Sequence, residues 1–279
     1  MSVIKLLTLP LQLAVMDVVV AILIVTGIAV VMGALILIVF HFFSVQGDTR
    51  EEEITELLPG VNCGGCGYSG CQAYAAALAS GKDSDLGRCT AGGQETANAL
   101  AHYFGHAAAK FVPKMAIVHC QGSQDQVRVK YQYTGSMDCR TATALFGGPG
   151  SCAYGCLGYG DCYRACKYGA ITIDNGLAHI HPEKCIACGA CVKACPRHLI
   201  RIEPKYSDLY TVRCMNPEPG ASVRESCNIG CIGCGLCVKN CASEAIHMEE
   251  KRAVIDVDKC THCNRCYEVC PTKAICKGL

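Results

Sequence analysis

The sequence predicts an α+β protein with one N-terminal transmembrane helix, a small cysteine-rich domain and two tandem copies of a cysteine-rich module. Three observations predict it: an uncharged apolar run near the N-terminus, 25 cysteines in 279 residues, and a cysteine pattern that repeats after 75 residues. A chain of this length suits two or three small domains better than one large core. The formal net charge of +1 gives no basic field, so we expect no nucleic-acid partner.

The first element is the uncharged run Val18–Phe43. As a helix it would cover roughly 39 Å, more than the ~30 Å hydrocarbon core of a bilayer. A cleavable signal peptide has a shorter apolar region of about 7–15 residues, and a buried core helix is rarely so uniform. We therefore predict a transmembrane helix over 17–43 after an N-terminal segment, 1–16. Only Lys5 and Arg50 flank it closely, so the positive-inside rule does not decide its orientation.

A small iron–sulfur domain is predicted over residues 44–112. Its candidate cluster ligands are Cys63, Cys66, Cys71 and Cys89. The segment from Gly65 to Gly70 formally satisfies the dinucleotide pattern G-x-G-x-x-G, but Leu-Pro-Gly-Val-Asn precedes it where that pattern requires a hydrophobic strand. We expect these glycines to let backbone amides approach the sulfurs, and we expect no NAD or flavin site in the chain.

The C-terminal half contains two cysteine runs of one kind. They are Cys185-x2-Cys188-x2-Cys191-x3-Cys195-Pro196 and Cys260-x2-Cys263-x2-Cys266-x3-Cys270-Pro271. Three thiolates at this spacing can bind one [4Fe-4S] cluster, and the fourth binds a neighbouring cluster, as in bacterial ferredoxins. Zinc needs only two such pairs, so the third cysteine is surplus for it. Disulfides fit poorly because adjacent x2 loops pair badly and nothing in the chain indicates export.

An internal repeat extends this pattern. Under a shift of 75 residues the cysteines at 152, 156, 162, 166, 185, 188, 191 and 195 superimpose on those at 227, 231, 237, 241, 260, 263, 266 and 270. The register indicates a tandem duplication, with ferredoxin-like modules over 140–205 and 206–279. Ala170–Ile173 and Ala245–Met248 are expected to form short strands beside the clusters.

A linking hairpin is predicted over residues 113–139, between the N-terminal domain and the modules. Met115–His119 and Gln126–Tyr133 alternate in polarity as strands do, and the two runs are close in sequence. We expect them to pair with each other.

The crossed-ligand rule assigns the regular clusters. Three sets of four cysteines follow from it: Cys231, Cys234, Cys237 and Cys270; Cys241, Cys260, Cys263 and Cys266; and Cys166, Cys185, Cys188 and Cys191. The remaining cluster of the first module is irregular, because Tyr159 stands where the second module has Cys234. We expect Cys152 to replace the missing ligand, which gives a set of Cys152, Cys156, Cys162 and Cys195. With the N-terminal domain, five [4Fe-4S] clusters are expected.

Five cysteines remain unassigned: Cys120, Cys139, Cys214, Cys227 and Cys276. Free thiols are the default interpretation for a reducing compartment. The 75-residue shift, however, superimposes Cys139 on Cys214. Cys120, Cys139, Cys214 and Cys227 are four in number, enough for one more ligand set. A sixth cluster is therefore kept as an alternative.

Short basic groups occur at Arg197 with Arg201 and at Lys251 with Arg252. Such groups are most often solvated surface. The alternative is a docking patch for an acidic electron carrier, whose binding would be steered by charge and weakened by salt.

Taken together, the membrane anchor, the motif Leu-Pro-Gly-Val-Asn-Cys-Gly-Gly-Cys-Gly-Tyr-Ser-Gly-Cys and the two modules resemble the B subunit of the Rnf complex, the ion-translocating ferredoxin:NAD oxidoreductase of bacterial membranes. The resemblance covers essentially the whole chain, and the N-terminal motif is its specific part. It implies a single-pass protein of the cell membrane whose cluster domains face the cytoplasm. It also implies that electrons come from reduced soluble ferredoxin and pass to other Rnf subunits, including the NAD/flavin subunit and integral membrane subunits.

Two other functions remain open from the sequence. One is the iron–sulfur subunit of a different membrane reductase, linked to quinone or to a molybdoenzyme; such subunits usually lack the Cys63–Cys89 motif. The other is a membrane-bound redox sensor, for which five clusters are more than a switch requires. No general base, nucleophile or substrate pocket is visible, so we expect no catalytic residues in the chain and electron transfer alone.

Overall fold

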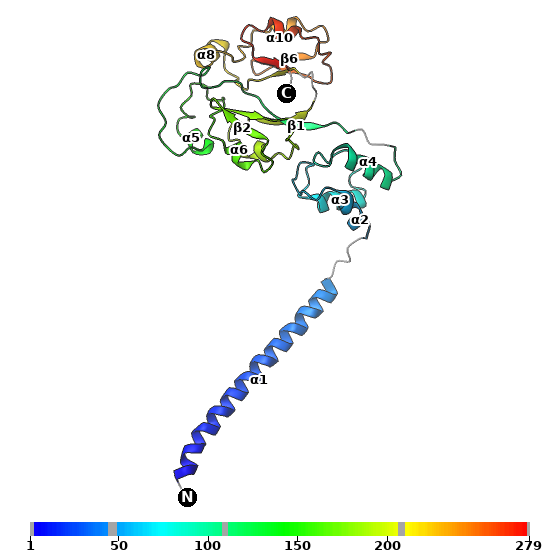
Figure 1. Cartoon of the computed structure of the whole chain (residues 1–279), viewed down its shortest axis with the longest axis vertical. Helices are drawn as coiled ribbons and strands as arrows, with labels where there is room; N and C mark the ends of the chain where they lie inside the picture. The colour runs from blue at the N-terminus through cyan, green and yellow to red at the C-terminus, as the bar shows by residue number, and fades with distance from the viewer. Residues whose placement is uncertain (1–2, 44–48, 108–110, 206–209, 278–279) are drawn as a thin grey trace. The chain divides into compact units, whose positions relative to one another are not determined.

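The computed structural model describes residues 3–43, 49–107, 111–205 and 210–277. The chain divides into two compact units, Met1–Thr49 and Arg50–Leu279 (Figure 1). Helix α1, Val3–Phe43, forms most of the first unit, so residues 3–16 of the predicted N-terminal segment continue the same helix. Its segment Ile22–His41 is long and apolar enough to cross a membrane, and its side chains are not buried against the protein.

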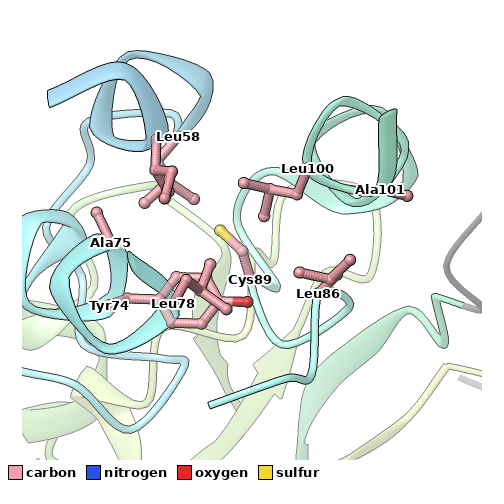
Figure 2. Close-up of a cluster of buried hydrophobic side chains, with 9 residues drawn as sticks. Leu58, Tyr74, Ala75, Leu78, Leu86, Cys89, Leu100 and Ala101 are labelled. Atoms are coloured by element: carbon pink, nitrogen blue, oxygen red, sulfur yellow. The ribbon is translucent and has the colours of Figure 1, made fainter. Parts of the chain in front are cut away.

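The N-terminal domain of the second unit contains helices α2 (Thr49–Leu57), α3 (Cys71–Ala79) and α4 (Gly93–Tyr103). Its apolar core draws on all three helices and on the loop between α3 and α4, with Ile54 and Leu100 fully buried. Figure 2 shows this core with the Cys89 sulfur among the aliphatic side chains. One candidate ligand is therefore part of the packing that holds the domain together.

We call the next part module 1, residues 114–204. Its elements are β1 (Lys114–Val118), α5 (Cys139–Ala144), α6 (Asp161–Ala165), β2 (Ile171–Asp174), β3 (Leu177–Ile180), α7 (Ala190–Ala194) and β4 (Ile200–Pro204). Two antiparallel sheets, β1–β4 and β2–β3, share one core with α6 and α7. The strand predicted over Ala170–Ile173 is confirmed as β2.

Module 2, residues 210–277, repeats this arrangement. Its elements are β5 (Tyr210–Val212), α8 (Gly220–Ser226), α9 (Leu236–Lys239), β6 (Ile246–Glu249), β7 (Arg252–Ile255), α10 (Arg265–Val269) and β8 (Ile275–Lys277). The strands pair antiparallel as β5–β8 and β6–β7. The strand predicted over Ala245–Met248 is confirmed as β6.

The predicted linking hairpin is wrong. Strand β1 pairs with β4, with Val118 opposite Ile200, and the second half of the expected hairpin forms only isolated bridges from Val127 to Cys227 and from Val129 to Gly150. Alternating polarity identifies a strand but not its partner, and β1 is buried at four of its five positions, more than a solvent-facing hairpin would require. Because β1 is the first strand of module 1, that module reaches back to Lys114.

The strand registers define which positions of the two modules are equivalent. Val118 lies opposite Ile200 in module 1, and Val212 lies opposite Ile275 in module 2, where Ile200 and Ile275 are related by the 75-residue shift. Val118 and Val212 are therefore equivalent. The segment that follows the first strand is longer in module 1, and it carries α5 there and α8 in module 2.

Candidate metal centres

The regular set of module 1 lies together in one pocket. Its cysteines are Cys166, Cys185, Cys188 and Cys191. The tight loop that carries the last three ends at Gly189, whose φ of 76° is left-handed, directly before α7. This conformation turns the chain so that Cys191 sits in the first turn of the helix and points back toward the loop, a turn for which glycine has no steric penalty.

In module 2 the structure brings together one regular set of four and three cysteines of the other. One pocket is lined by Cys231, Cys234, Cys237 and Cys270. In the second set, burial first and then the sulfurs of Cys260, Cys237 and Cys263 raise the pKa of Cys266 to about 11, so Cys266 lies near Cys260 and Cys263 and also near Cys237 of the first set. Cys234 and Cys263 are exposed, which leaves one edge of each set open to solvent.

The irregular set of module 1 differs from the prediction. The pocket equivalent to that of Cys231 is lined by Cys139, Cys156, Cys162 and Cys195, and Cys152 does not line it. Most lining positions of the two pockets correspond under the 75-residue shift, but Tyr159 stands in place of Cys234, and Cys139, Asp161 and Pro196 line only the module 1 pocket. Cys139, which comes from the segment after β1, supplies the fourth sulfur instead.

Contacts with α6 hold Cys139 at this position. The backbone N–H of Cys139 donates to Asp161 Oδ1 at 3.0 Å, and that of Arg140 donates to Asp161 Oδ2 at 3.2 Å. Arg164 donates to the carbonyl oxygen of Tyr159 at 2.9 Å and forms an ion pair with Asp161. The ring of Tyr159 packs at 5.6 Å from that of Tyr133, on the segment that leads to α5.

Cys152 instead lies in a pocket between the two modules. The cysteines that line this pocket are Cys120, Cys152, Cys214 and Cys227. The backbone N–H of Cys156 donates to Cys120 Sγ at 3.4 Å, and the buried Asn216 Nδ2 donates to Cys152 Sγ at 3.7 Å. The possible sixth set therefore exists as a group of neighbours, but with Cys152 and Cys139 exchanged relative to the prediction.

The residues that follow β1 join the two modules around this pocket. Buried His119 lies 2.7 Å from Glu203 Oε1 through Nε2 and 3.1 Å from the Val212 carbonyl oxygen through Nδ1, so it connects β4 of module 1 to β5 of module 2. The remaining unassigned thiol, Cys276, donates to Gln121 Oε1 at 2.7 Å and does not line the pocket.

The electrostatics of the pockets suit a cationic metal core. Burial, and to a lesser extent neighbouring cysteine sulfurs, raises the pKa of Cys162, Cys191 and Cys120 to about 12 each. A thiol with such a pKa stays neutral near pH 7 unless a cation binds it. Among the described residues no three His, Cys, Asp or Glu side chains converge on a single metal ion. In a cubane cluster each cysteine binds a different iron, so the four sulfurs surround a volume.

The N-terminal set is also a group of neighbours. Burial raises the pKa of the Cys89 thiol, and the sulfurs of Cys66, Cys71 and Cys63 raise it further. Backbone amides approach these sulfurs as expected: Gly92 donates to Cys89 Sγ at 3.4 Å and Gly65 to Cys63 Sγ at 3.5 Å. The Asn62 side chain accepts a hydrogen bond from the backbone N–H of Cys71 at 2.8 Å and so closes the loop.

Two of the four basic residues considered for docking are unsuited to it. Arg197 is only partly exposed and its terminal nitrogens bind backbone carbonyl oxygens, and Arg252 is buried, with Nη1 3.2 Å from Met215 Sδ. Arg201 and Lys251 are exposed. Arg197 and Arg252 therefore make contacts inside the modules, and only Arg201 and Lys251 remain as candidates for a docking surface.

The exchange of Cys139 and Cys152 had a detectable signal in the sequence. Cys152 superimposes on Cys227 under the 75-residue shift, so both copies contain this cysteine. A residue present in both copies is a poor candidate to repair a ligand missing from only one of them. Cys139 superimposes on Cys214, but the strand register shows that this match is accidental, because the structural equivalent of Cys214 is Cys120.

Comparisons with known proteins identify iron–sulfur domains in three segments of the chain. Residues 58–91 match the FeS family of Fe-S cluster domains. Residues 178–201 match a 4Fe-4S binding domain, and residues 230–274 match a 4Fe-4S dicluster domain. The chain is 41% identical over 260 residues to the B subunit of the Na(+)-translocating ferredoxin:NAD(+) oxidoreductase complex of Acetobacterium woodii, covering 91% of this chain and 78% of that protein. The chain belongs to the family of Rnf B subunits.

Two further members of this family align over most of their length. The B subunit of the ion-translocating oxidoreductase complex of Methanosarcina acetivorans is 33% identical, over 89% of this chain and 94% of that protein. The B subunit of the proton-translocating ferredoxin:NAD(+) oxidoreductase complex of Clostridium ljungdahlii is 37% identical, over 93% of each chain. This member of the Rnf family is thus an iron–sulfur subunit for electron transfer.

Proposed function

We propose that this protein accepts electrons from reduced soluble ferredoxin and relays them one at a time to the other subunits of an ion-translocating ferredoxin:NAD oxidoreductase. Those partners include the NAD/flavin subunit and integral membrane subunits. The observation that carries the proposal is that the cysteines gather in six places: four pockets lined by four cysteines each, the N-terminal group, and Cys260, Cys263 and Cys266, to which the spacing adds Cys241. The names of the relatives support the donor and the complex.

Each set would hold one [4Fe-4S] cluster. The proposed sets are Cys63, Cys66, Cys71 and Cys89; Cys166, Cys185, Cys188 and Cys191; Cys139, Cys156, Cys162 and Cys195; Cys120, Cys152, Cys214 and Cys227; Cys231, Cys234, Cys237 and Cys270; and Cys241, Cys260, Cys263 and Cys266. A bound cubane takes up and releases one electron without making or breaking bonds to its ligands. The protein's part is to bind the thiolates, exclude water and fix the distances between neighbouring sites.

The first contact in the series joins the N-terminal domain to module 1. A Cβ placed on Gly65 would lie 3.0 Å from the carbonyl oxygen of Ala187 and 3.3 Å from the Cα of Cys188. The cysteine loops of the two sites therefore touch through backbone, and a larger residue at position 65 would separate them. Within each module the helices connect the two sites in the same way: in α7, Cys191 belongs to one set and Cys195, at its C-terminal end, to the other.

The pocket between the modules completes the series. On one side the backbone N–H of Cys156 donates to Cys120 Sγ at 3.4 Å. On the other side the backbone N–H of Cys231 donates to the sulfur of Cys214 and lowers its pKa, against the larger effect of burial. A cluster in this pocket would lie between the last site of module 1 and the first site of module 2 and so join them. This contiguity supports six clusters rather than five.

We propose that α1 anchors the protein in the cell membrane by a single pass and that the cluster domains lie on the cytoplasmic side. The apolar length of α1 and membership of the family support the anchor. Twenty-five cysteines without a disulfide requirement fit a reducing compartment. Protease added to inside-out vesicles should therefore remove the cluster domains. If the cluster domains were protected in inside-out vesicles and cleaved in right-side-out vesicles, they would lie on the opposite side of the membrane.

The function is tested with the full-length chain, purified in detergent without oxygen. We expect about 24 iron atoms and as much acid-labile sulfide per chain. Mixing with reduced ferredoxin should bleach the visible absorption of the protein as ferredoxin is oxidised, with several electrons taken up per chain. Ferredoxin from which iron has been removed is the matched control. Zinc in place of iron, or no electron uptake by a fully loaded chain, would contradict the proposal.

A further inference from the structure

The Arg197 side chain forms part of the wall of the pocket lined by Cys139, Cys156, Cys162 and Cys195. Its Nη1 donates to the carbonyl oxygens of Cys152 at 3.1 Å and Gly155 at 2.5 Å, and its Nη2 donates to that of Gly147. These bonds fix the guanidinium in one orientation. Its Nε is buried and has no hydrogen-bond partner within the described part of the chain.

Module 2 has no such group at the equivalent place. The 75-residue shift places Thr272 at the position of Arg197, and Thr272 lines the pocket of Cys231, Cys234, Cys237 and Cys270. Most other wall residues are alike in character, for example Leu157 in module 1 and Ile232 in module 2. The pockets thus differ in two charged side chains, Arg197 and Asp161, which line the module 1 pocket only.

The acidic group of the same wall does not cancel this charge. Asp161 also lines the module 1 pocket, but its two carboxylate oxygens accept hydrogen bonds from the backbone of Cys139 and Arg140. It also forms an ion pair with Arg164 at 2.5 Å. The hydrogen bonds of Arg197, by contrast, go to neutral carbonyl groups, and none of the described carboxylates pairs with it. Its positive charge therefore acts on this pocket through Cys156 and Cys139, and also on the pocket between the modules through Cys152 and Cys120.

We propose that Arg197 makes the site of Cys139, Cys156, Cys162 and Cys195 easier to reduce than its counterpart in module 2, an inference that rests on the proposed function. Reduction adds one electron and therefore one negative charge to the site, and no bond to the protein forms or breaks. A fixed cation in a partly desolvated wall stabilises the more negative state. The buried Nε–H has no hydrogen-bond partner among the described residues, so only a sulfur of the bound cluster could accept from it, and such a bond would raise the potential further.

The test compares the wild-type full-length chain with R197Q and R197K in a potentiometric titration followed by EPR, with dithionite as reductant. At a fixed potential we expect the ratio of reduced to oxidised cluster at this site to fall at least tenfold in R197Q, about 59 mV for a one-electron couple. R197K keeps the charge and should shift the ratio much less. R201Q, which removes an exposed charge from β4, is the matched control and should leave the ratio unchanged.

Identification of the site uses C139A, which should remove its EPR signal and about four irons. If C139A removes the signal and fully loaded R197Q keeps the wild-type midpoint, the role of Arg197 is overturned while the proposed function stands. If C139A keeps all its iron, the ligand assignment beneath both proposals is overturned.

A second measurement does not depend on how well R197Q folds. In wild-type protein labelled with 15N in its arginine side chains, pulsed EPR should detect a nitrogen coupling on the signal that C139A lacks. Absence of that coupling would overturn the Nε–H contact.

Discussion

Cys120 and Cys214 are equivalent residues of the two modules, and both line the same pocket. Each lies two residues beyond the first strand of its module, β1 ending at Val118 and β5 at Val212. The other two sulfurs of the pocket, from Cys152 and Cys227, are also equivalent, by the 75-residue shift. The pocket therefore takes the same two positions from each module, as expected for a site formed where two copies of one fold meet.

This symmetry leaves Cys139 for the irregular site, and paired substitutions can test that grouping. Cys139 and Cys156 line one pocket, so C139A/C156A should lose about four irons, no more than either single variant. Cys152 and Cys156 belong to different proposed sets, so C152A/C156A should lose about eight. Iron and acid-labile sulfide per chain, measured on anaerobic preparations, give the answer.

The alternative grouping makes the opposite prediction. If Cys152 and Cys156 shared a cluster, C152A/C156A would lose about four irons; C139A/C156A would lose about eight if Cys139 bound a further cluster, and about four, with no loss in C139A alone, if Cys139 were a free thiol. C276A is the matched control, because Cys276 binds Gln121 and should lose no iron.

A ligand restored at position 159 should compensate for the loss of Cys139. Tyr159 occupies the position of Cys234, which lines the equivalent pocket of module 2. We expect C139A/Y159C to regain the roughly four irons that C139A loses, since the loop geometry around the position is shared between modules. The measurement is iron content with EPR of the reduced sample. C139A/Y163C, with the new thiol at an exposed tyrosine, is the control, and equal recovery in both variants would argue against position 159.

The Asp161 carboxylate should affect retention of the same cluster without binding it. D161A removes the acceptor for the first two N–H groups of α5, and loss of such a cap costs about 1 kcal/mol, roughly a fivefold change in an equilibrium. We expect a chelator to remove iron about fivefold faster from this site alone. E225A, which changes an exposed carboxylate on α8, serves as the control. Faster loss from all sites would indicate general destabilisation instead.

Cysteine spacing predicted the regular sites because it acts locally. In Cys185–Cys191 the three ligands are three positions apart, so the loop can adopt few conformations and the sulfurs must converge. The strands at Ile171 and Ile246 were predictable because they follow shortly after Cys166 and Cys241.

Long-range pairing was not predictable in this way. Strand β1 finds its partner β4 more than 80 residues later, and nothing in its own residues specifies that partner. The same limit applies to Cys139 and Cys152, which both lie on the long segment between β1 and α6. Their assignment depends on how that segment folds against Asp161, Tyr159 and module 2. The spacing between cysteines does not determine these contacts.

Proton release on loading the iron-free chain should persist to high pH. Burial raises the pKa of Cys120, Cys162 and Cys191 to about 12, whereas an exposed cysteine ionises near pH 8.5. In the iron-free fold these three thiols therefore keep their protons between about pH 9 and 11, and binding to iron displaces them. Anaerobic reconstitution followed with a pH indicator at pH 9.5 should release at least five protons, from these three thiols and from Cys237 and Cys266, whose pKa burial raises to about 11. A peptide of residues 258–272, whose thiols are exposed, should release few protons at that pH. Equal release per thiol from peptide and protein would mean that burial does not control ionisation in the pockets.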